Sequence, residues 1–181
     1  THDAQDITES GSRLIINFNR DWKFRLGDDP DASLVAHDDA KWDSVGLPHS
    51  FSMPYFAAPD FYTGYGWYRN HLAVPGEWSG KRVNLEFDGA FQVTELLVNG
   101  RRIGEHRGGY NGFTFDITDA LKPGDNLVAV RVKVAQRLAI RAPGVGHEVQ
   151  PEVERVAGLV PDDGGQEIGL KTREQVHRLG L

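Results

Sequence analysis

Carboxylate side chains are the residues of this sequence that could most directly carry out chemistry. A pair of carboxylates, one acting as an acid and the other as a nucleophile or a base, can hydrolyse a glycosidic bond. The candidates are Asp38, Asp39, Glu86, Asp88, Glu95, Glu105 and Asp116. Adjacent carboxylates in a loop are usually solvated, and alternating carboxylates on a strand usually mark its outer face. We therefore interpret this set as surface charge, and we expect Asp116 to accept hydrogen bonds from the backbone at a turn.

Three histidines, His49, His71 and His106, lack the spacing that a metal site needs. None of them forms a His-x-His or His-x-x-x-His pair, and the chain has no cysteine that could complete a zinc site. The sequence also has no Gly-x-Ser-x-Gly motif, so a nucleophilic serine has no support. We expect structural histidines, no metal and no cofactor.

Aromatic residues crowd the stretch 53–67, which is too rich in proline and glycine to be one regular strand. They are Tyr55, Phe56, Phe61, Tyr62, Tyr65 and Trp67. Sugars stack on exposed aromatic rings, and apolar patches on a surface often mark interfaces. Such a segment is therefore either packed under another element or displayed for binding.

A hairpin and a glycine-rich turn lie further along the chain. Asn99-Gly100 lies between an apolar run and Arg101–Ile103, and a two-residue hairpin turn of this kind needs positive φ at both positions. The pair Gly108-Gly109 then permits a sharp change of direction before a new strand. We expect Gly100, Gly108 and Gly109 to hold backbone conformations that are closed to other residues.

Alternation of apolar and polar residues predicts an all-β fold. The alternating runs lie at 14–18, 22–26, 83–87, 113–117 and 128–134, and Gly, Pro and Asp turns separate them. Strands at this spacing are typical of a two-sheet sandwich. One helical turn is expected at 119–121, with Thr118 or Asp119 as its cap.

Composition and charge exclude several classes of protein. The 181 residues are 39% hydrophobic, which is enough for one domain with a core. A net charge of −6 argues against a surface for nucleic acid or for an anionic membrane, and no apolar run is long enough for a transmembrane helix. The chain begins at Thr1, so we expect a mature secreted or periplasmic chain, or an excised domain.

The last quarter of the sequence differs from the rest. All of the tryptophan, tyrosine and phenylalanine residues lie at or before Phe115, and Gly and Pro interrupt the segment 135–181. Within it, 153–157 is compatible with a strand or a helical turn, and 172–179 with a short helix. We predict an N-terminal extension at 1–13, a β-sandwich at 14–134, and a divergent tail at 135–181 whose composition favours disorder.

Several sequence pieces in order resemble one known family. They are the strand pair at 14–26, Leu-Pro-His-Ser-Phe at 47–51, Gly-Trp-Tyr-Arg at 66–69, the strand at 83–89, the hairpin and glycine turn at 98–118, and the strand at 124–132. Together they resemble the N-terminal sugar-binding domain of glycoside hydrolase family 2, a jelly-roll sandwich, and they are most similar to β-galactosidases. The family's closing Gly-Ile-Tyr-Arg strand does not occur, so we expect it to be missing or replaced, with an unpaired edge or a strip of core left exposed.

The resemblance implies a role in carbohydrate metabolism for a longer protein, of which this chain would be the non-catalytic N-terminal domain or a truncated fragment. Family members are retaining O-glycosyl hydrolases whose two carboxylates lie in a (β/α)₈ barrel of some 250 residues, which a chain of this length cannot also hold. The resemblance implies that this domain supports the barrel and the substrate entrance, that the aromatic segment packs between domains, and that His49 holds its loop against a neighbour. The expected partners are the remaining family 2 domains and a β-glycoside. A free-standing carbohydrate-binding module and an inactive structural remnant remain as alternatives.

Overall fold

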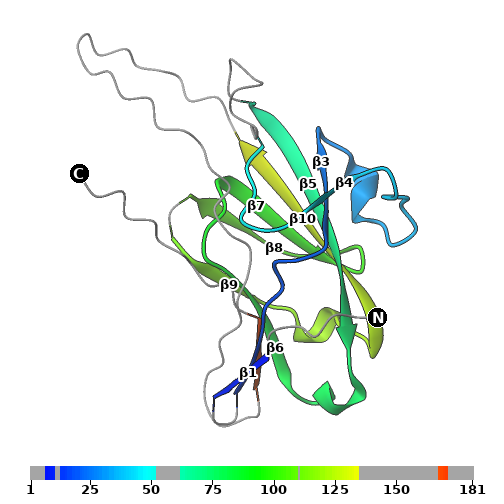
Figure 1. Ribbon diagram of the computed structural model, residues 1–181, viewed down its shortest axis with the longest axis vertical. Coiled ribbons are helices and arrows are strands. Elements are labelled where there is room, and N and C mark those ends of the chain that lie inside the picture. The colour runs from blue at the N-terminus through cyan, green and yellow to red at the C-terminus, as the bar shows by residue number, and fades with distance from the viewer. Residues whose placement is uncertain (1–6, 11–12, 52–61, 110, 135–166, 171–181) are drawn as a thin grey trace, which may run out of the picture.

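The described residues form two β-sheets and three short 3₁₀ turns (Figure 1). The structure, a computed structural model, describes residues 7–10, 13–51, 62–109, 111–134 and 167–170. The 3₁₀ turns are η1 (Pro30–Ser33), η2 (Gly76–Trp78) and η3 (Thr118–Ala120). In this part of the chain, no helix has the length and apolar character needed to cross a bilayer. The all-β class predicted from the alternating runs is confirmed. The 153–157 and 172–179 segments lie outside the described residues.

The larger sheet has six strands, all antiparallel. Their order is β4 (Asp43–Val45), β3 (Trp22–Leu26), β5 (Gly64–Val74), β10 (Gly124–Val134), β7 (Gln92–Val98) and β8 (Arg101–Gly108). The two central strands, β5 and β10, each have 11 residues and pair along their whole length (Figure 1). This pair is the longest ladder of the fold, and it positions the outer face described below.

The smaller sheet has five strands. Their order is β1 (Ile7–Ser10), β2 (Arg13–Ile16), β11 (Glu167–Leu170), β6 (Arg82–Phe87) and β9 (Phe113–Asp116). Strand β11 is parallel to both of its neighbours, whereas the other pairs are antiparallel. The sequence predicted neither β1, which lies in the expected N-terminal extension, nor β11, which lies in the expected tail. The tail thus supplies a strand between β2 and β6, where the expectation was an open edge.

The core lies between the two sheets and follows the predicted alternation. On β10, Val128, Val130, Val132 and Val134 are all buried, as period-two patterning requires. Leu26 is an exception, because its side chain is 42% exposed at the last residue of β3, where the chain turns away at Gly27.

The hairpin between β7 and β8 has the predicted geometry. Asn99 has φ of 52° and Gly100 has φ of 81°, so both turn residues are left-handed. Gly108 also has positive φ, at 154°. The expectation for Gly109 is wrong in its reason, because its φ is not in the left-handed range. A β-carbon at Gly109 would instead overlap the ring of Phe91, so close approach is what requires glycine there.

The predicted helical turn near 119–121 is the 3₁₀ turn η3, Thr118–Ala120. The predicted cap is wrong, since Ile117 precedes the turn and no side chain caps it. Asp116 acts one step earlier, because its Oδ1 accepts hydrogen bonds from Thr118 N at 3.0 Å and from Thr118 Oγ1 at 2.6 Å. Asp116 therefore accepts the predicted backbone bond where β9 leads into the turn.

Candidate contact surface on the six-stranded sheet

The outer face of the six-stranded sheet carries a second, smaller apolar cluster. Alternation along β5 directs Gly66 and Tyr68 to the core and Trp67 to the opposite face. Trp67 packs there with Ala32, Trp42 and Ala129, and all four are buried. Two of these residues come from the segment 27–42, which connects β3 to β4. This segment, which we call the covering segment, therefore shields part of the outer face.

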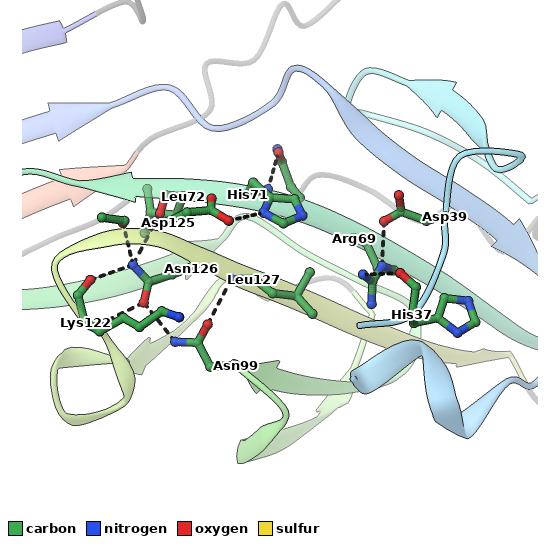
Figure 2. A network of polar contacts seen from close by, with 12 residues as sticks. His37, Asp39, Arg69, His71, Leu72, Asn99, Lys122, Asp125, Asn126 and Leu127 are labelled. Atoms are coloured by element: carbon green, nitrogen blue, oxygen red, sulfur yellow. Dashed lines mark hydrogen bonds and ion pairs between the residues drawn. The ribbon is translucent and has the colours of Figure 1, made fainter. Parts of the chain in front are cut away.

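Arg69 fixes the covering segment to the sheet (Figure 2). Its side chain is almost completely buried, and its Nε donates to Asp39 Oδ2 at 2.6 Å. Nη1 donates to the carbonyl oxygens of Ala32 and Leu34, and Nη2 donates to that of His37. Every guanidinium nitrogen is thus satisfied, as a buried charge requires. Sequence analysis placed Arg69 in a strand motif but had no signal for these partners, which lie at least 30 residues away.

Arg131 on β10 is the second arginine that holds the covering segment on the six-stranded sheet. Its Nε and Nη2 donate to the two carboxylate oxygens of Asp28, at 2.9 and 2.5 Å. The guanidinium also lies 4.1 Å from the ring centre of Tyr65, and Lys133 approaches the same ring at 5.4 Å. These hydrogen bonds from Arg131 lower the pKa of the Asp28 carboxyl, although burial acts in the opposite direction.

A strip of alternating charge continues across the exposed part of this face. Glu95 on β7 accepts from Arg102 Nε on β8 and lies 3.5 Å from Arg131 Nη1. Glu105 accepts from both Arg102 and Arg107. The hydrogen bond to Glu95 raises the pKa of Arg102. Surface ion pairs of this kind contribute little stability.

The six aromatic residues predicted as contacts fall into two groups. Tyr55, Phe56 and Phe61 lie outside the described residues. Tyr62 is half-buried, packs edge-on against Phe51 and donates to the Tyr65 carbonyl at 3.2 Å. Trp67 is buried and donates from Nε1 to Asp28. Tyr65 is half-buried, and the Arg131 guanidinium lies over its ring.

His49 packs on the opposite side of the same sheet, beside the core. Its Nδ1 lies 2.9 Å from the hydroxyl of Tyr68, and its ring packs on Phe24 at 4.4 Å. Burial lowers the pKa of His49, against the nearby charge of Asp43, and burial raises the pKa of Tyr68. His49 therefore joins the loop 47–51 to the neighbouring strands.

His106 and Thr94 are directly opposed on β8 and β7. The imidazole ring of His106 stacks on Phe113 at 3.8 Å, which links the two sheets. Its Nε2 and the Thr94 Oγ1 are buried, and neither has a hydrogen-bond partner. No ligand chemistry follows from two such atoms alone.

The side-chain amides of Asn99 and Asn126 form a hydrogen-bond network next to the β7–β8 hairpin (Figure 2). Asn99 Nδ2 donates to the Ala120 carbonyl and to Asn126 Oδ1, while Asn99 Oδ1 accepts from Leu127 N. Asn126 is completely buried and also bonds both the N–H and the carbonyl of Lys122. The network pins the β7–β8 turn to η3 and to the start of β10. Sequence analysis identified Asn99 through the turn but not the role of Asn126.

The candidate carboxylates whose contacts are described are held by arginines or by backbone groups. Asp39, Glu95 and Glu105 pair with arginines, and Asp38 accepts from the backbone N–H of Ala40. Asp116 lies 3.6 Å from Arg82 Nε in addition to its turn contacts. Across the ranges that the structure describes, no three His, Asp or Glu residues are grouped as metal ligands.

Comparison with known proteins gives one consistent family. The family described as "Glycosyl hydrolases family 2, sugar binding domain" matches residues 33–143. A β-galactosidase of Thermoanaerobacter pseudethanolicus is 39% identical over 142 residues, which are 76% of this chain and 19% of that protein. A β-glucuronidase of Bacteroides fragilis is 36% identical over 74% of this chain and 19% of its own length. Among solved structures, a Bacteroides uniformis β-glucuronidase superposes with a TM-score of 0.69 and 35% identity, covering 78% of this chain and 17% of the other.

Proposed function

Because this chain belongs to glycoside hydrolase family 2, we propose that it supports the catalytic barrel and the substrate entrance of a β-galactosidase-like enzyme. The observation that carries the proposal is coverage. The alignments with two relatives cover about three quarters of this chain. They cover only about a fifth of the length of each relative.

The chemistry of the surface supports the same role. Each carboxylate that could act as an acid or a nucleophile and has a described contact is held by an arginine or by a turn. The strip formed by Glu95, Arg102, Glu105 and Arg107 offers alternating charges to another domain. Hydrolysis would then proceed through two carboxylates that lie in the barrel.

A hybrid enzyme tests this role. The segment of the Thermoanaerobacter pseudethanolicus β-galactosidase that matches this chain is replaced by the chain itself, and the same enzyme lacking the segment is the control. We expect the hybrid to hydrolyse a chromogenic β-galactoside and the deletion variant to be inactive. The isolated chain should give no turnover above a buffer blank. A deletion variant with full activity, or turnover by the isolated chain, would contradict the proposal.

The isolated chain also tests the alternative of a free-standing carbohydrate-binding module. The Arg131 guanidinium occupies a position over the half-buried ring of Tyr65 where a sugar would otherwise stack, and Trp67 is buried. We therefore expect calorimetric titration of the isolated chain with lactose to show no saturable heat. Saturable binding by the isolated chain would favour the module.

A further inference from the structure

The chain contains two Asn-Gly pairs, and the structure places them in different surroundings. They are Asn99-Gly100 in the β7–β8 turn and Asn111-Gly112 in the bend between β8 and β9. Asparagine is a thermolabile residue, and it reacts most readily before glycine, because glycine has no β-carbon to hinder approach to its backbone nitrogen. The surroundings of each side-chain amide then decide how fast the pair reacts.

The reaction makes and breaks one bond at Cγ of the asparagine. The backbone nitrogen of the glycine loses its proton to base and attacks Cγ, and the side-chain nitrogen leaves as ammonia. Water then opens the resulting cyclic imide at one of its two carbonyl groups, which gives an aspartyl or an isoaspartyl residue. The attacking nitrogen must approach Cγ from above or below the amide plane, so contacts that fix this plane slow the reaction.

Three hydrogen bonds fix the carboxamide of Asn99, which is half-buried. Nδ2 donates to the Ala120 carbonyl at 2.9 Å and to Asn126 Oδ1 at 2.8 Å. Oδ1 accepts from Leu127 N at 3.0 Å, and Figure 2 shows the carboxamide turned towards Asn126 and Leu127. Even at the lower end of their usual net strength, three such bonds together slow a reaction that must break them by more than about tenfold.

Asn111 has none of these restraints. Its side chain is exposed, and within the ranges that the structure describes no hydrogen bond or ion pair joins it to another residue. Gly112 is exposed as well. The carboxamide of Asn111 is therefore free to rotate, and both base and water reach the pair.

The fold requires glycine in both pairs, for two different reasons. Gly100 has φ of 81°, in the left-handed range. A β-carbon at Gly112 would lie 3.2 Å from the Phe87 carbonyl oxygen, which is closer than an ordinary van der Waals contact. Neither glycine is easily replaced, so the two pairs differ in the protection of their asparagines.

We propose that Asn111-Gly112 is a deamidation site of the folded protein, and that hydrogen bonding protects Asn99-Gly100 until the chain unfolds. Conversion at residue 111 adds a negative charge, and the isoaspartyl form lengthens the main chain by one carbon atom.

The consequence of this modification falls on β9, which begins two residues later. Phe113 pairs in register with Phe87 on β6, and its ring stacks on the rings of Phe87 and His106 at 4.7 and 3.8 Å. A longer main chain just before Phe113 should loosen these contacts, which join β9 to both sheets.

Incubation of the full-length chain tests the proposal. One sample is kept folded and the other unfolded in urea, both in the same mildly alkaline buffer, and each is digested with trypsin at intervals. Cleavage after Arg101 and Arg107 puts the two pairs into different peptides. Reverse-phase separation with mass spectrometry then measures the amide, aspartyl and isoaspartyl forms of each peptide, and a digest made at the start corrects for conversion during digestion.

In the folded sample, we expect the Asn111 peptide to convert at least about ten times faster than the Asn99 peptide. In urea, the two peptides should convert at similar rates, because both pairs are then free. Similar rates in the folded sample, or faster conversion of the Asn99 peptide there, would overturn the proposal. It would also be overturned if unfolding did not accelerate the conversion of Asn99.

Asn111→Gln is the matched control. Glutamine keeps an exposed amide but must form a larger ring, so it reacts far more slowly, and a surface change of this kind should leave the fold intact. The variant should lose the conversion at residue 111 and leave the behaviour of Asn99 unchanged. After parallel incubation, amide hydrogen exchange in β9 should be faster in the parent than in the variant. Persistent conversion of the same peptide in Asn111→Gln would show that the reactive residue is not Asn111.

Discussion

The two sheets of this sandwich are stabilised in different ways. The six-stranded sheet is antiparallel throughout, and its central strands pair over 11 residues beneath a covering segment that two arginines hold in place. The five-stranded sheet has no strand longer than the six residues of β6, and it is joined through β11 from a distant part of the chain. The six-stranded sheet is therefore stabilised by side chains that hold the covering segment on its outer face. The five-stranded sheet is stabilised by the short ladders that β11 forms with β2 and β6.

The largest loss of stability should come from removing Arg69, which holds the covering segment on the six-stranded sheet. Arg69→Ala leaves the Asp39 carboxylate and three carbonyl oxygens without their donor, in a largely buried place. We expect it to lower the free energy of unfolding by about 3–5 kcal/mol, as breaking a buried pair does. Urea unfolding measures the loss, and Arg25→Ala is the control because the exposed Arg25–Asp29 pair should contribute less than about 1 kcal/mol. Equal losses for the two variants would show that the covering segment is not held by Arg69.

The next effect tests the ladder of the five-stranded sheet. Gly169→Pro removes one backbone N–H from a central strand, which should cost about 2–3 kcal/mol of local stability. Amide hydrogen exchange should become faster in β2 and β6 and should remain unchanged in β5 and β10. A uniform change in all four strands would mean that the two sheets open as one unit, and the contrast between them would not hold.

A smaller loss of stability is expected from changing Asn99 in the β7–β8 turn, which is hydrogen-bonded to Ala120 of η3. Asn99→Ala loses the side-chain bonds to Ala120, Asn126 and Leu127, and it places alanine, which tolerates the left-handed region less well than asparagine, at a φ of 52°. Asn99→Gly loses the same bonds without the backbone strain. We expect Asn99→Ala to be less stable than Asn99→Gly by about 1 kcal/mol in thermal unfolding. If the two variants melt at the same temperature, the left-handed turn is not what Asn99 provides.

Local patterns in the sequence predicted strands of both sheets. They are β3, β10 and the β7–β8 hairpin in the larger sheet, and β2, β6 and β9 in the smaller one. Alternation in 128–134 and the pair Asn99-Gly100 each report on residues within one strand or one turn, and β10 and the β7–β8 hairpin follow them. The family resemblance added the Gly-Trp-Tyr-Arg strand at 66–69, which lies within β5. These signals involve residues that are close in the sequence, so they can be recognised without knowledge of the tertiary structure.

Features that depend on distant pairing were not predictable in this way. β11 has four residues with one glycine, and its place is set by β2 and β6, which lie far away in the chain. The partners of Arg69 lie in a segment that sequence alone describes only as a loop. Trp67 was predicted as a contact residue, and its burial depends on Trp42 from the same covering segment.

The smallest expected effect is a pH dependence that arises at His49, on the core side of the six-stranded sheet. Burial lowers the pKa of His49 in the folded state, so the unfolded chain binds a proton more readily. Stability is therefore unaffected above the ordinary histidine pKa of about 6.5 and falls as the pH drops below it. We expect His49→Gln to be less stable than the parent at pH 7.5, because the contacts with Tyr68 and Phe24 change, and to lose less stability between pH 7 and pH 5. Urea midpoints measured at each pH give the two slopes. Parallel slopes for parent and variant would show that protonation of His49 does not limit the acid stability of this sheet.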